Sequence, residues 1–203
     1  MKKDRKRLIR EYAEAILTAL LLALFIRAYI IQAFKIPSGS MIPTLLVGDH
    51  ILVNKFIYGT KIPFSDRRFL IFRKPEKGDI IVFKFPEDPK KDFIKRVIAT
   101  DGDVLESKNK VIYVNGEEVK EPYAYHGDSI IRPRGGDPRD NFGPLIVPKN
   151  KIFVMGDNRD QSFDSRYWGF VDLKAIKGEA LIIYWSWDPQ KWLRFNRIGR
   201  LVK

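Results

Sequence analysis

Six short apolar runs, separated by turn residues, dominate the chain from residue 50 onward. The runs lie at 50–58, 79–85, 93–99, 110–114, 151–155 and 179–185. Runs of this length that are rich in Val, Ile and aromatic residues are typical of β-strands. Between two of them, Asn115 and Gly116 predict a two-residue hairpin with a type I′ turn. We therefore expect residues 35–203 to form one mainly β domain.

A long apolar segment precedes this domain. Residues 13–34 would reach roughly 33 Å as a helix, against a hydrocarbon core of about 30 Å. Six basic residues and two acidic ones come directly before it, a net charge of +4. Arg27 can extend its head group to the interface. We predict a single transmembrane helix, with residues 1–12 in the cytoplasm and residues 35–203 outside it. No small-x-small site precedes Lys35, which argues against a cleaved leader.

Composition narrows the remaining choices. The chain has no cysteine, which excludes disulfides and cysteine-ligated metal sites. Its net charge of +12 is compatible with nucleic acid, anionic membrane or acidic partners. Residues 121–150 are rich in Pro, Gly, Asp and Arg and are predicted to form an irregular exposed loop. The tail at 184–203 mixes tryptophan with arginine, which suits either a membrane interface or a final strand with a solvated basic end.

Histidine offers little for catalysis. The chain has only His50 and His126. His50 follows Asp49, and with Ser40 it completes the residue types of a Ser-His-Asp triad, but no nucleophile-elbow pattern supports one. The HExxH zinc motif is absent, so we expect no metal.

A serine can instead be activated by a neutral lysine whose pKa is lowered by burial. Strand alternation at 93–99 places Lys95 on one face with Phe93 and Val97, although an exposed edge-strand lysine would give the same pattern. Ser40 lies in the turn-like string PSGS, which could hold a hydroxyl and a backbone N–H toward one point or be a plain linker.

A third polar cluster, GDNRDQSFDSRYWG at 156–169, alternates acidic and basic residues. It is typical of a rigid solvated loop, and equally of a loop that supports a buried amine.

Together these segments resemble bacterial type I signal peptidase. The likeness rests on the apolar anchor, FKIPSGSMIPTLLVGDHILVNK, KGDIIVFKFP, FIKRVIATDGD and VMGDNRDQSFDSRYWGFV, and the last two are the most specific. It implies an antiparallel β catalytic domain at a membrane, a Ser/Lys dyad and no cofactor. It also implies that secretory preproteins are cut after small residues at the first and third positions before the bond, with no nucleic acid partner. We expect a monomer.

The resemblance also implies a role for individual residues. Ser40 would be the nucleophile and Lys95 the general base, and Ser38 would form the oxyanion hole with the Ser40 N–H. Ser162 would position the lysine amine, supported by Asp164 and Arg166. Two alternatives stay open: a related Ser/Lys peptidase that cleaves itself or one dedicated substrate, and a non-catalytic, membrane-tethered binding module.

Overall fold

The computed structural model describes residues 2–61, 68–188, 190 and 192–203. Its helices are α1 (Lys2–Tyr29) and α2 (Ser165–Trp168), with 3-10 turns at Arg159–Gln161, Leu173–Ala175 and Phe195–Arg197. Its strands are β1 (Ile31–Lys35), β2 (Asp49–Asn54), β3 (Tyr58–Lys61), β4 (Arg68–Ile71), β5 (Ile80–Lys84), β6 (Asp92–Ala99), β7 (Val104–Lys108), β8 (Val111–Val114), β9 (Glu117–Glu118), β10 (Phe142–Ile146), β11 (Lys151–Met155), β12 (Val171–Asp172), β13 (Ile176–Asp188) and β14 (Trp192–Leu193).

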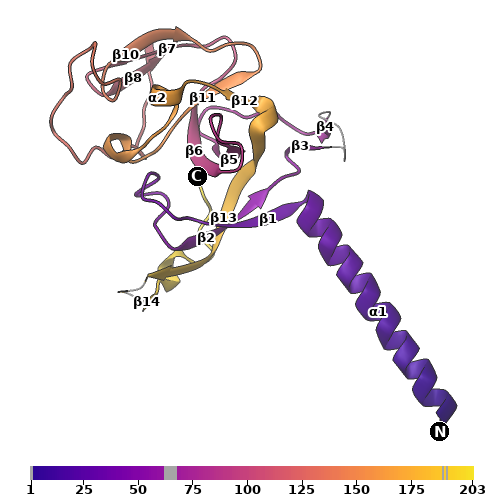
Figure 1. Cartoon of the computed structure of the whole chain (residues 1–203). Coiled ribbons are helices and arrows are strands. Elements are labelled where there is room, and N and C mark those ends of the chain that lie inside the picture. The colour runs from indigo at the N-terminus through magenta and orange to yellow at the C-terminus, as the bar shows by residue number, and fades with distance from the viewer. Residues whose placement is uncertain (1, 62–67, 189, 191) are drawn as a thin grey trace.

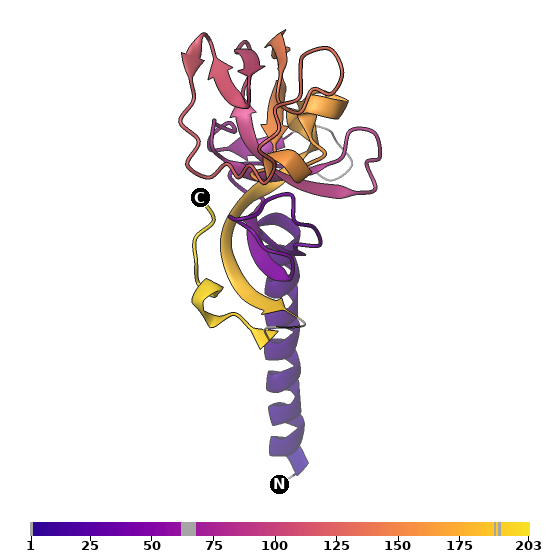
Figure 2. The same cartoon turned by 90° about the vertical axis from the view of Figure 1, so that its left-hand side faces the viewer.

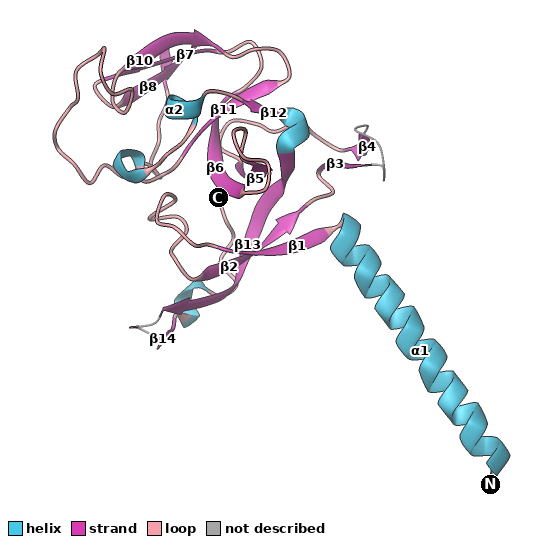
Figure 3. Cartoon of the chain, viewed as in Figure 1, coloured by secondary structure: helices cyan, strands magenta, loops and turns pink. Residues whose placement is uncertain are grey.

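The strands form one large sheet and two smaller ones. The large sheet follows the order β1-β2-β13-β5-β6-β11-β12, with β14 paired to β13. A four-stranded sheet follows the order β10-β7-β8-β9, and β3 pairs with β4. Every pair of strands in the described residues is antiparallel. The predicted mainly antiparallel β fold is therefore confirmed (Figure 3).

All six predicted apolar runs contain a strand. The predicted hairpin is also present, because β8 pairs with β9 and places Val114 opposite Glu117. Asn115 and Gly116 between them have φ values of 55° and 84°, the left-handed values that a type I′ turn requires.

The prediction of an irregular exposed loop at 121–150 is only partly right. Residues 142–146 form β10, which pairs with β7. Arg139 and Asp140 are buried in this stretch. Their side chains form two hydrogen bonds with each other, at 2.9 and 2.7 Å, which offsets the cost of burying the two charges. Composition could not reveal this strand, since its Gly and Pro are typical of loops yet are tolerated in an edge strand at a bulge.

Helix α1 extends away from the β domain, as two perpendicular views show (Figures 1 and 2). It ends at Tyr29 rather than at residue 34, because residues 31–35 form β1 and pair with β2. Its side chains are exposed between residue 5 and residue 28. Within the described parts of the chain, no helix combines the length and the apolarity needed to cross a membrane.

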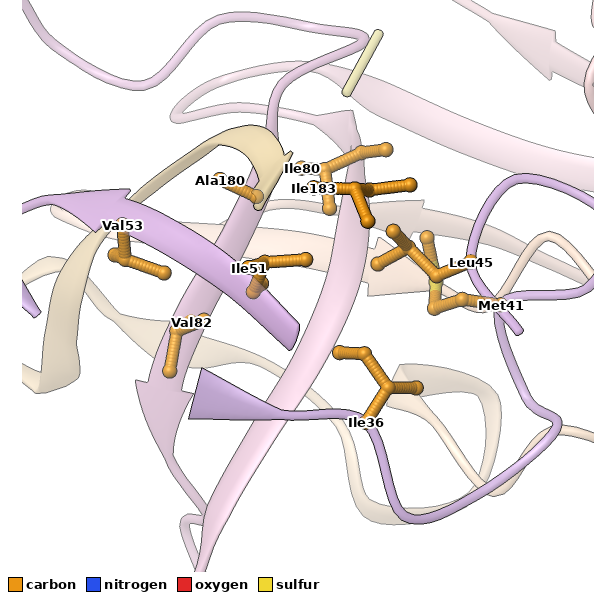
Figure 4. Close-up of a cluster of buried hydrophobic side chains, with 9 residues drawn as sticks. All are labelled: Ile36, Met41, Leu45, Ile51, Val53, Ile80, Val82, Ala180 and Ile183. Atoms are coloured by element: carbon orange, nitrogen blue, oxygen red, sulfur yellow. The ribbon is translucent and has the colours of Figure 1, made fainter. Parts of the chain in front are cut away.

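One buried cluster lies beneath the segment that joins β1 to β2 (Figure 4). Ile36, Met41 and Leu45 of this segment pack with apolar side chains of β2, β5 and β13, namely Ile51, Val53, Ile80, Val82, Ala180 and Ile183. Because Met41 and Leu45 are fully buried, the polar residues between the apolar ones are held at a defined place over the sheet.

Candidate active site

Ser40 lies in the segment that joins β1 to β2. The Ile36 N–H donates to Asp49 O at 2.8 Å, and the Gly48 N–H donates to Ile36 O at 3.0 Å, which closes the base of the segment. Met41, directly after Ser40, is buried in the core and so fixes this part of the chain over the sheet. Ser40 itself is half-buried. The nucleophile candidate is therefore carried on a segment that packing holds in place.

Lys95 lies on β6, between β5 and β11 in the large sheet. Its side chain is only 4% exposed, and its Nζ lies 2.6 Å from Ser40 Oγ. Burial lowers the pKa of Lys95 to about 8, with the Asp164 carboxylate raising it and the Arg166 guanidinium lowering it. The structure therefore brings the predicted base and nucleophile together, and the lowered pKa leaves a minority of the amine neutral near physiological pH, far more than for an exposed lysine.

A cavity of about 420 Å³ opens beside this pair. It is lined by Pro37, Ser38, Gly39, Ser40, Asp92, Phe93, Ile94, Lys95, Gln161 and Phe163. Ser38 is exposed and lines the same cavity as Ser40, so both serines face a space that a peptide could enter.

Asp164 and Arg166 form a buried ion pair in the loop after β11. Arg166 Nε donates to Asp164 Oδ1 at 2.8 Å and its Nη2 donates to Asp164 Oδ2 at 2.9 Å. Burial alone would raise the pKa of Asp164, but the charge and hydrogen bonds of Arg166 outweigh it, and the pKa is lowered. Arg166 also donates to the backbone carbonyls of Arg139 and Arg159, so it ties the loop to its neighbours.

Ser162 is buried beside the nucleophile segment. Its Oγ makes no hydrogen bond of ordinary length within the described residues, although it is near enough to Asp164 to help lower that carboxyl's pKa. A Cβ built on Gly156 would lie 2.3 Å from Ser162 Oγ and 2.4 Å from Ser40 O. Gly156 therefore leaves the space in which these two serines approach each other.

Asn158 is a supporting residue that the sequence did not single out. Its backbone N–H donates to Ser40 O at 3.1 Å, and its side-chain Nδ2 donates to Gly39 O at 3.1 Å. It therefore grips the nucleophile segment at two successive carbonyls. The only sequence signal was its place in the GDNRD string.

A second missed feature is the buried pair of Arg96 and Asp157. Arg96, next to Lys95 on β6, donates to both Asp157 oxygens at 2.8 and 2.7 Å. Thr44 of the nucleophile segment donates to the same carboxylate at 2.6 Å. These contacts join the lysine strand, the GDNRD loop and the serine segment at one carboxylate.

The residues of a Ser-His-Asp triad are not assembled. Asp49 is fully buried and accepts hydrogen bonds from Arg197 and Ser186. The His50 ring instead lies 3.2 Å from Gly48 O. Among the described residues, no cluster of three or more potential ligands could hold a metal ion.

Comparison with known proteins identifies the family that the chain matches. Residues 9–185 match the family described as signal peptidase, peptidase S26. A signal peptidase I of Pseudomonas fluorescens is 35% identical over 234 residues, covering 100% of this chain and 82% of the relative. One from Aquifex aeolicus is 38% identical over 218 residues, covering 82% of this chain and 80% of the relative.

A solved signal peptidase I from Enterococcus faecalis V583 shares 31% identity, covers 53% of this chain and 97% of its own, and has a TM-score of 0.43. On the family match and on relatives that are 35% identical and matched over about four fifths of their own length, the chain belongs to the signal peptidase family, peptidase S26, and is a hydrolase of the signal peptidase I type.

Proposed function

We propose that this enzyme removes signal peptides with a Ser/Lys dyad, and that it cuts after small residues at the first and third positions before the bond. One observation carries the proposal: Lys95 Nζ lies 2.6 Å from Ser40 Oγ, and the amine is buried. A buried lysine at this distance can accept the serine proton when it is neutral.

The first chemical step is acylation. Neutral Lys95 accepts the proton of Ser40 while Oγ attacks the scissile carbonyl, which gives a tetrahedral intermediate. The resulting ammonium then donates a proton to the leaving amine, and an acyl-enzyme remains. After losing this proton, Lys95 activates water for hydrolysis of the ester. No step in this sequence requires a cofactor.

The surrounding residues have supporting roles in this proposal. The Ser40 N–H and the Ser38 hydroxyl stabilise the oxyanion, since both belong to the segment that lines the cavity. Ser162, whose Oγ is buried and has no ordinary hydrogen bond among the described residues, is proposed to orient the lysine amine, and Asp164 with Arg166 to hold the loop that carries Ser162. The buried, doubly hydrogen-bonded Asp164 and Arg166 pair supports this role, because it fixes the backbone on both sides of the loop.

We further propose that the N-terminal segment anchors the enzyme in a membrane as a single pass, with residues 1–12 cytoplasmic and residues 35–203 extracytoplasmic. Leu20, Leu21, Leu22, Leu24 and Phe25 of α1 are each more than half exposed, which is costly in water. Basic residues precede them. Alkaline extraction of membranes, with protease protection of an N-terminal tag, tests this topology; release of the protein by alkali would contradict it.

We also propose that the enzyme works as a monomer.

The tail at residues 184–203 carries a second proposed contact with lipid. Trp185, Trp187 and Trp192 are 44%, 45% and 77% exposed, and tryptophan is favoured at membrane interfaces. Residues 189 and 191 of this tail lie outside the described residues. Replacing the three tryptophans in a protein that begins at residue 30 should weaken binding to liposomes, and unchanged binding would exclude this contact.

The decisive experiment is cleavage of a preprotein with an Ala-x-Ala site. Detergent-solubilised wild type, Ser40→Ala and Lys95→Ala are compared by product mass. Cleavage after the site by the wild type alone, with both variants folded, supports the dyad. Full activity of Lys95→Ala would exclude it as the base. Mass loss of the enzyme itself, abolished by Ser40→Ala, would favour the self-cleaving alternative.

A further inference from the structure

An aromatic side chain stands exposed at the mouth of the cavity beside Ser40 and Lys95. Phe163 lines this cavity and is 51% exposed, although the residues on either side of it, Ser162 and Asp164, are buried. The chemistry described so far uses its neighbours and leaves this ring without a role.

The Phe163 ring is held in position by other rings. It lies 5.6 Å from the Tyr167 ring and packs edge-to-face on Phe85 at 6.1 Å. Phe85 stacks in turn on Phe93 at 4.4 Å. Phe93 lines the same cavity, with its ring centroid 5.8 Å from Lys95 Nζ. Phe163 is therefore a prepositioned apolar surface that leads up to the dyad.

Two charged residues line the cavity, Asp92 and Lys95. The Asp92 carboxylate accepts from Lys177 Nζ at 2.6 Å, and Lys95 Nζ lies 2.6 Å from Ser40 Oγ. An apolar side chain that settles on Phe163 would therefore not strip water from an unpaired carboxylate.

Strand alternation indicates which substrate residue reaches the ring. The cavity is lined by residues 37–40, from the segment after β1, and by residues 92–95 of strand β6, and a peptide that runs along β6 is extended. In an extended Ala-x-Ala sequence the two alanines point to one face and x points to the opposite face. With the alanines directed into the enzyme, x is directed toward the open rim, where Phe163 is exposed.

We infer that Phe163 is a specificity-determining residue that contacts the middle residue x, and that it favours large apolar or aromatic side chains there. The inference rests on the proposed cleavage after Ala-x-Ala. It assigns a preference to a position that the requirement for small residues leaves open.

The test uses a set of peptides that differ only at x, with Leu, Phe, Ser or Glu in that position, cleaved by the full-length enzyme in detergent. The wild type should cleave the Leu and Phe peptides with a kcat/KM roughly fivefold above that for Ser. Phe163→Ala should bring this ratio close to one.

Two further variants sharpen the result. Phe163→Lys should raise cleavage of the Glu peptide above that of the Leu peptide, because the exposed position now offers a positive charge. Phe72→Ala is the matched control, since Phe72 is 64% exposed, packs on the Phe56 ring and is not among the residues that line the cavity. It should keep the wild-type ratio.

The outcomes separate this inference from the proposed function. A wild type that ignores x, or a Leu-to-Ser ratio unchanged in both Phe163 variants, overturns the inference while cleavage after Ala-x-Ala stands. A wild type that cleaves none of the peptides overturns both. Folding of each variant is checked by its thermal melting curve.

Discussion

At the scale of single residues, the proposed mechanism depends on whether the Lys95 amine is protonated. Burial places its pKa at about 8, below the ordinary value of 10.5. The neutral amine is the active form, so kcat/KM should rise as the pH rises through about 8. A rate profile that is flat across this range would show that Lys95 is not the base.

The same shift predicts a pH-dependent cost in stability. A lysine whose pKa is lowered on folding binds its proton more weakly in the native state, so folding is penalised below about pH 8 and the penalty is relieved up to pH 10.5. Lys95→Met removes this penalty. Its free energy of unfolding relative to wild type should fall by about 3 kcal/mol as the pH rises through this range. Denaturant unfolding at both ends measures it; a constant difference would contradict a buried, titrating amine.

Gly156 makes a further prediction at this scale. An added Cβ would lie 2.4 Å from Ser40 O and 2.3 Å from Ser162 Oγ, closer than atoms can approach. Gly156→Ala should therefore displace the nucleophile segment and lower kcat by about a hundredfold, because small misplacements of reacting groups are costly. Gly136→Ala is the control, since a Cβ there meets no atom within 4 Å and it should leave kcat unchanged. Wild-type kcat in Gly156→Ala would refute the close packing.

At the scale of elements, β6 carries both a candidate catalytic residue, Lys95, and one partner of a buried ion pair, Arg96. Lys95 faces Ser40, while the adjacent Arg96 binds Asp157 at the end of β11, and the Arg96 guanidinium also lies 3.8 Å from the Tyr123 ring centroid. Both members of the Arg96 and Asp157 pair are almost fully buried. The strand therefore cannot shift toward or away from the GDNRD loop without separating this pair.

The buried pair of Arg96 and Asp157 makes a prediction about the free energy of unfolding. Asp157→Ala leaves the Arg96 charge buried and partly unpaired, and should lower the free energy of unfolding by about 3–5 kcal/mol. Glu11→Ala breaks the exposed pair with Arg7 and should change it by less than about 0.5 kcal/mol. Chemical denaturation measures both. An equal effect of the two variants would mean that the buried pair has no special weight.

At the scale of the whole molecule, the N-terminal helix and the β domain are structurally separate. Helix α1 stands clear of the sheets, and its junction with them is made by Lys55, which donates from Nζ to Ala28 O and from its backbone N–H to Ile30 O (Figure 1). The Ser40 and Lys95 pair lies on segments that do not contact the helix through any of these bonds.

The separation of α1 from the β domain makes a prediction about folding and cleavage without the helix. A protein that begins at residue 30 should fold, with a thermal melting curve like that of the full chain, and should cleave a short soluble peptide with unchanged kcat/KM. Cleavage of a membrane-inserted preprotein should fall, because confinement to the same surface no longer raises the local concentration. Loss of peptide cleavage in a folded protein would show that α1 contributes directly to the site.

The sequence alone predicted most of the strands from local pattern, and it identified the candidate dyad through the resemblance of its motifs to a known family. Alternation around Lys95 marked one apolar face, and Asn115 with Gly116 specified a turn through backbone conformations that they adopt readily. The end of α1 could not be found in this way. Ile31, Ala33 and Phe34 continue the apolar segment in sequence, but in the fold residues 31–35 pair with β2 instead of extending the helix.

What the tertiary structure alone decided is how distant residues meet. The 2.6 Å contact between Lys95 and Ser40 joins positions 55 residues apart, and Thr44 reaches Asp157 across 113 residues. The burial that lowers the pKa of Lys95 comes from the place of β6 between β5 and β11 and from the serine segment beside it. Such contacts depend on long-range strand order, which hydrophobic pattern does not encode, and so only the folded chain shows that the two candidate residues lie in contact.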